Sequence, residues 1–175
     1  MIAGAIRFTL THLPLILAIA ALVMAAVTRG IPDWAERTLA WLLLLAVGIE
    51  SIWAGFFHVA FPGTAASFIG WQVSPFQFEI GVADLAIGAV AVASFWRGLA
   101  FKSAVVAYIT LFYIGVAIGH VHQMLAAGNT RPGNFGVLLA MTLAKAVGLP
   151  LLLAVALRHS RRAPLPAATP IGGRP

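Results

Sequence analysis

Apolar residues form five long runs along the chain, and short polar segments separate them. The runs predict helices at about residues 8–28, 34–61, 75–96, 103–124 and 135–157. A helix needs about 20 residues to cross roughly 30 Å of hydrocarbon, and runs of this length meet that need. The runs do not alternate between apolar and polar positions, as the strands of a membrane barrel would. The pattern predicts an all-α membrane protein, a single bundle of about five transmembrane helices over residues 1–157.

Polar residues, proline and glycine mark the ends of the predicted helices. Asp33 and Glu36 predict a capping box at the start of the second helix, and Pro62-Gly63 ends that helix. The segment Ser74 to Gln77 places serine at the N-cap, proline at the first helical position and glutamine three residues after the cap. Asn134 is the expected cap of the fifth helix. These signals support the boundaries drawn from the apolar pattern.

Composition excludes several soluble classes of protein. The 175 residues include only 11 Lys and Arg and 5 Asp and Glu, so 9% of the chain is charged against roughly 25% in a soluble domain. So few charges cannot cover the surface of a soluble enzyme, a disordered chain or a nucleic-acid module. The net charge of +6 does not change this conclusion, because the cations separate apolar runs instead of sharing one face. The absence of cysteine excludes disulfides and thiolate metal sites.

The basic residues are concentrated on one side of the predicted membrane. The other side holds only Arg7 and Arg131 in its polar segments. By the positive-inside rule, the N-terminus lies outside and the C-terminus lies in the cytoplasm. Residues 158–175 are rich in Arg, Pro, Ala and Gly and predict a disordered cytoplasmic tail. The eight residues of the basic side are Arg29, Arg37, Arg97, Lys102, Arg158, Arg161, Arg162 and Arg174.

Three predicted helices carry imidazole or carboxylate groups near the external face. His58 lies near the end of the second helix, Glu79 near the start of the third, and His120 and His122 near the end of the fourth. Neutral imidazole with carboxylate suits iron, copper or zinc, and paired imidazoles suit haem. The three histidines are therefore candidate metal ligands. A quinone pocket and plain interfacial residues are the alternatives. His120 and His122 point about 200° apart on a helix, so only one of them can face a small site.

Three charged residues are expected near the middle of the membrane. Glu50, Asp84 and Lys145 lie at similar depth in the second, third and fifth helices. Placing one charged side chain in hydrocarbon costs at least about 2.5–3.5 kcal/mol. Because pairing with an opposite charge reduces this cost, Lys145 is expected to pair with Glu50 or Asp84. Such a group either fixes the helix register or forms a proton or substrate pathway. Together with Glu79, these residues are candidates for ligand binding or a proton relay.

Small residues accompany these polar groups on three helices and predict close helix packing. On the second helix, Gly48, Ser51 and Gly55 share a face with His58. Gly81 and Gly88 flank Asp84 on the third helix, and on the fourth helix Gly115 and Gly119 share a face with His122. No motif of a zincin, a P-loop, a dinucleotide site or a nucleophile elbow occurs, so whether the chain is an enzyme is left open.

The central part of the chain carries a more specific signature. Ile69-Gly70-Trp71, then Ser74-Pro75-Phe76-Gln77 and Glu79, follow His58 and precede Gly119-His120. This segment, IGW-x2-SPFQ-x-E, resembles an uncharacterised family of small bacterial integral membrane proteins. The resemblance implies a helical bundle in the bacterial inner membrane, and it implies no reaction.

The sequence thus suggests a polar pocket that opens to the external side of an inner-membrane bundle. We expect a binding or redox-associated role with a metal, haem or quinone as the ligand. The alternatives are a non-catalytic accessory subunit and a proton-coupled carrier of small molecules. The expected partners are the lipid bilayer and either further copies of the chain or a larger membrane complex, and nucleic acid is excluded.

Overall fold

The computed structural model describes residues 2–162, which form helices joined by short turns, without a strand. The predicted all-α class is confirmed. The predicted disordered tail covered residues 158–175, and this is wrong for residues 158–162, which belong to the last helix; residues 163–175 lie outside the described residues. The elements are α1 (Ile2–Val27), α2 (Trp34–Trp41), the π-helical η1 (Leu42–Ile49), α3 (Glu50–Ala60), α4 (Pro62–Ile69), α5 (Pro75–Ser94), α6 (Leu99–Ala127) and α7 (Val137–Arg162).

Four helices in the described part of the chain are long and apolar enough to cross a membrane. They are Trp34–Ala60, which joins α2, η1 and α3, followed by Pro75–Ser94, Leu99–Ala127 and Val137–Arg162. The apolar part of α1, Thr11–Val27, is shorter. The sequence pattern predicted about five spans. Length and composition support four in the described residues, and α1 accounts for the difference.

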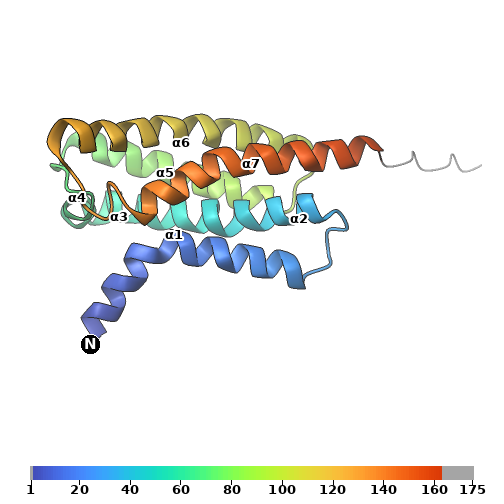
Figure 1. The fold of residues 1–175 in the computed structure, drawn as a ribbon, viewed down its shortest axis with the longest axis horizontal. Helices are drawn as coiled ribbons and strands as arrows, with labels where there is room; N and C mark the ends of the chain where they lie inside the picture. The colour runs from blue at the N-terminus through green and yellow to red at the C-terminus, as the bar shows by residue number, and fades with distance from the viewer. Residues whose placement is uncertain (1, 163–175) are drawn as a thin grey trace, which may run out of the picture.

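The long helices form a bundle, and α1 lies along one side of it (Figure 1). α1 packs against α2, η1 and α7, while its first turns diverge from the bundle (Figure 1). Pro14 lies inside α1. Because proline lacks an amide hydrogen and its ring clashes with the preceding turn, it accounts for a change of direction at this point.

The bundle has two distinct ends, which we name by the short helices found there. The α4 end holds α4, the start of α5 and the loop between α6 and α7, whereas the α2 end holds the start of α2 and the end of α7 (Figure 1). Two glycines at the α4 end, Gly70 and Gly128, have positive φ and end α4 and α6 in the left-handed conformation that glycine adopts without strain. The short helix α4 occupies a segment that the sequence pattern assigned to a loop.

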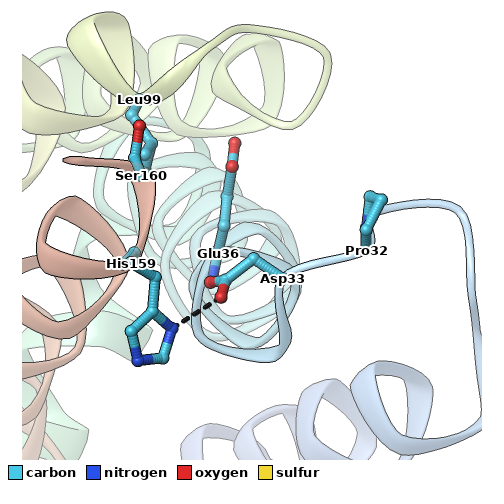
Figure 2. A pocket seen from close by; sticks show the side chains of 7 residues that line it. Pro32, Asp33, Glu36, Leu99, His159 and Ser160 are labelled. Atoms are coloured by element: carbon cyan, nitrogen blue, oxygen red, sulfur yellow. Dashed lines mark hydrogen bonds and ion pairs between the residues drawn. The ribbon is translucent and has the colours of Figure 1, made fainter. Parts of the chain in front are cut away.

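Asp33 joins α2 to α7 at the α2 end. Its Oδ1 accepts a hydrogen bond from the Glu36 amide at 2.8 Å, as the predicted N-cap requires, and its Oδ2 lies 2.6 Å from Nδ1 of His159. Figure 2 shows this contact at the wall of an open pocket of about 350 Å³, with the Glu36 carboxylate turned away from His159. Burial raises the pKa of Asp33, but the hydrogen bond from Glu36 and the neighbouring His159 outweigh burial and hold this pKa below its ordinary value of 3.8.

The contacts of Asp33 predict a loss of stability in acid. A carboxyl group whose pKa is lowered by folding stabilises the protein above its ordinary pKa, and this contribution is lost as the pH falls through the folded-state value. In Asp33→Asn, which keeps a capping oxygen, we expect the melting temperature in detergent to fall less between about pH 6 and pH 3 than it does in the unmodified protein. Asp33→Ala, which also loses the cap, should cost about 1 kcal/mol at neutral pH. Equal acid sensitivity of Asp33→Asn and the unmodified protein would contradict this prediction.

Candidate functional site

The middle of the second span is wound as a π-helix, and this places Glu50. At the end of η1, the Glu50 amide donates to the Leu45 carbonyl, five residues back. An α-helical amide at this position would donate to the Ala46 carbonyl instead. The Ala46 carbonyl accepts a hydrogen bond from Nζ of Lys145 at 3.2 Å. Local π-helical winding frequently marks functional positions in helices, and here it supplies a backbone oxygen to a buried cation.

Lys145 is the centre of a buried group of polar side chains contributed by four helices. Its Nζ lies 2.6 Å from Oε1 of Glu50 and 4.7 Å from the centre of the Tyr113 ring. The Lys145 side chain is 5% exposed and that of Glu50 is 14% exposed. Of the two acids that the sequence offered as its partner, the structure pairs Lys145 with Glu50. We call Glu50, Asp84, Tyr113 and Lys145 the charged cluster.

Asp84 is the second acid of the charged cluster. It interacts electrostatically with Glu50 and Lys145 from α5, and no side chain in the described part of the chain hydrogen-bonds to its carboxylate. Oε2 of Glu50 is buried and also lacks a hydrogen-bond partner among the described residues. The charged cluster therefore combines two carboxyl groups with one ammonium group, and it leaves carboxylate oxygens without a donor.

Glycines bring η1 and α3 into close contact with α5 on both sides of Asp84. A methyl group added to Gly55 would lie 2.6 Å from the Gly81 carbonyl, and one added to Gly88 would lie 2.8 Å from the Gly48 carbonyl. The predicted close packing by small residues on these two helices is confirmed. We call this contact the glycine seam.

The corresponding prediction for the fourth helix is wrong. No atom lies within 4 Å of a methyl group added to Gly115 or Gly119, so these glycines do not pack against another helix. The opposite face of α6 is buried instead, and it carries Tyr113 and His120. His122, expected on the packed face, is exposed.

His120 belongs to a hydrogen-bonded group at the α4 end that is centred on Asn134. Oδ1 of Asn134 accepts from Nδ1 of His120 at 2.8 Å and from Nε1 of Trp71 at 3.2 Å. Its Nδ2 donates to the carbonyls of His120 and Asn129. Both amide hydrogens thus have acceptors, which fixes the orientation of the amide and makes Nδ1 the protonated nitrogen of His120. Asn134 is fully buried and does not cap the fifth helix as predicted, since α7 begins at Val137.

The structure places the four polar residues expected at the external level in different surroundings. Glu79 and His122 are exposed, His120 bonds to Asn134, and His58 lies on α3 beside Gly81. Residues 2–162 hold no group of three or more His, Asp or Glu side chains placed to bind a metal ion. A metal, haem or quinone at this level stays a prediction. Nδ1 of His58 is buried without a hydrogen-bond partner.

Two side chains of these polar groups were not predicted from the sequence, and a third was misplaced. Tyr113 and Asn134 were not among the candidates, although a polar group inside or beside an apolar run is the signal that could have identified them. Lys102 was assigned to a loop, but α6 begins at Leu99, so Lys102 lies in its first turns with 1% exposure. Lys102 pairs with Glu36 at 3.0 Å and donates to the Arg97 carbonyl.

Comparison of the chain with other proteins gives one positive result. Neither the curated proteins nor the solved structures contain a match. A family model matches residues 6–162, a range that contains almost all of every helix in the bundle. The chain therefore belongs to DUF6790, a family of unknown function.

Proposed function

We propose that this protein is an integral membrane protein that takes up and releases a proton at the charged cluster, as the proton-binding step of proton-coupled transport. The observation that carries the proposal is the composition of the cluster. One ammonium group, Lys145, faces two acids, Glu50 and Asp84, inside helices long enough to span a membrane. Ionisable residues at this depth most often belong to ion pathways or proton relays.

The charge balance of the cluster supports a proton as its ligand. The ion pair of Lys145 with Glu50 is neutral overall, so the second acid leaves one uncompensated negative charge unless it binds a proton. An uncompensated charge in hydrocarbon is costly, whereas a protonated carboxyl group is neutral and can donate a hydrogen bond. Oε2 of Glu50, which lacks a donor, is an acceptor for such a bond. A single exchangeable proton then decides whether the cluster is neutral or negative.

The proposal includes the topology of the bundle in the bacterial inner membrane. We place the α2 end in the cytoplasm, because Arg29, Arg97 and Arg158 are exposed there. Exposed Trp34 and Trp96 at the same end suit the level of the lipid headgroups. With α1 as a fifth crossing, the N-terminus lies outside. A reporter enzyme fused after Arg162 should then be active only in the cytoplasm.

Proton binding is tested by infrared spectroscopy of the full chain in vesicles during a pH titration. We expect a carbonyl band from a protonated carboxyl group that appears and disappears with pH in the unmodified protein. Asp84→Asn should abolish this band, and it should reduce proton flux into vesicles driven by a membrane potential by at least about tenfold. Glu79→Gln is the matched control, since Glu79 is an exposed acid on the same helix.

Two results would contradict the proposal. Unchanged spectra and flux in Asp84→Asn would show that Asp84 binds no exchangeable proton. If Glu50→Gln and Asp84→Asn lowered only the thermal stability, the cluster would fix the positions of the helices, and an accessory subunit would become the better interpretation.

A further inference from the structure

The surroundings of the charged cluster differ between its two sides along the bundle. The continuous group of buried apolar side chains extends from the cluster toward the α2 end. Leu39 and Leu43 precede Glu50 in the chain, Val106 and Ile109 precede Tyr113, and Ile87 and Leu149 follow Asp84 and Lys145. Given the direction of each helix, all six lie on the α2 side of the cluster. Each is 4% exposed or less, so they form a layer of large buried aliphatic groups.

Most positions buried on the opposite side of the cluster, toward the α4 end, are small or polar, although Leu139 of α7 is also buried there. The buried positions there include Gly55 on α3, Gly81 on α5, Ala117 on α6 and Thr142 on α7. None of these four belongs to the continuous apolar group. Asp84, which faces this side, is only half-buried. The continuous layer of large aliphatic side chains therefore lies on one side of the cluster only.

His58 lies on the α4 side of the cluster, at the next level of the glycine seam. A methyl group added to Gly81 would lie 2.9 Å from Cβ of His58, and Asp84 follows Gly81 by one turn on α5. The His58 ring is half-buried, and its buried Nδ1 has no partner among the described residues. The other titratable side chain near this part of α5 is the exposed Glu79, α4 contributes none, and His12 of α1 bonds to the Phe8 carbonyl.

We infer that the charged cluster exchanges protons only with the face of the membrane at the α4 end, and that His58 carries the proton between this face and Asp84. The inference rests on the proposed function and adds a direction and a further residue to it. An imidazole suits this role because one ring nitrogen can accept a proton while the other releases one, so the ring returns to its neutral form. The apolar layer blocks the same exchange toward the α2 end, because it offers no group that can bind a proton.

The test uses the full chain in sealed vesicles that contain both orientations. Trypsin added outside cuts the exposed arginines at the end of α7 only in molecules whose α2 end faces outward. Molecules that trypsin leaves uncut at α7 have their α4 end facing outward. After a step in the external pH, the carboxyl band should therefore respond rapidly in these molecules only, so the fraction that responds should equal the uncut fraction. His58→Phe, which keeps an aromatic ring without a proton-binding nitrogen, should slow this response by about tenfold or more. His122→Phe is the matched control, since His122 is an exposed histidine near the same end.

The outcomes separate this inference from the proposed function. A rapid response in cut and uncut molecules alike would overturn the sided access, while proton binding at the cluster would stand. An unaltered rate in His58→Phe would overturn the role of His58. A band that does not respond to pH in either orientation would overturn the proposed function and this inference together. The sidedness is measured on the unmodified protein, so it does not depend on the folding of any variant.

Discussion

Replacing Lys145 by methionine is expected to destabilise the protein by about 3–5 kcal/mol, because it leaves a buried carboxylate without its cation. Lys145 is 5% exposed, and its Nζ contacts Oε1 of Glu50 at 2.6 Å and the Ala46 carbonyl at 3.2 Å. Methionine has a similar length and suits an apolar environment, so the loss comes from charge rather than from a cavity. The free energy of unfolding in mixed micelles, compared with that of the unmodified protein, measures the effect.

A second substitution distinguishes the loss of the ion pair from a packing defect. Combining Lys145→Met with Glu50→Gln removes both charges, and we expect most of the lost stability to return. Glu50→Gln alone should destabilise the protein less than Lys145→Met, because Asp84 stays available to compensate Lys145. If the double variant were no more stable than Lys145→Met, the charge of Glu50 would not be the cause, and the assignment of the pair would be wrong.

The positions of the helices along the chain could be predicted from sequence because the long apolar runs and the polar segments between them mark them. A span needs a minimum number of apolar residues, and loops need polar ones, so runs of residues determine where a helix begins and ends within a few positions. The second and third helices end within two residues of the expected positions. The same pattern indicated that Glu50 and Lys145 lie at a similar depth. That similarity was sufficient to predict that Lys145 pairs with an acid.

The rotation of the helices was harder to predict. Each residue turns an α-helix by about 100°, so a single change in winding moves every later side chain to another face. Nothing in Leu42 to Ile49, an apolar run, indicates the π-helical winding that places Glu50. Small residues indicate that a face can pack closely, but they do not show that a neighbour is there. The glycine seam and the pair Gly115 and Gly119 of α6 carry the same signal, and only the seam packs against another helix.

The glycine seam and the charged cluster depend on each other. Close approach of α3 and α5 brings Asp84 near Glu50. A wider separation would admit lipid or water and would weaken the electrostatic coupling between the acids. Positions on the seam therefore influence the cluster without touching its side chains.

Gly55→Ala provides the sharpest test of this dependence. The added methyl group would lie 2.6 Å from the Gly81 carbonyl and 2.9 Å from the Leu85 amide nitrogen, both backbone atoms that cannot rotate away. We expect α3 and α5 to separate, at a cost of about 1–3 kcal/mol of stability despite the gain of about 1 kcal/mol that alanine normally brings to a helix. The pH at which the carboxyl band titrates should also shift. Gly115→Ala is the matched control, because its methyl group meets nothing within 4 Å, and it should leave stability unchanged or raise it. Equal effects of the two substitutions would show that the seam is not tightly packed, and the proximity of the two acids would then need another cause.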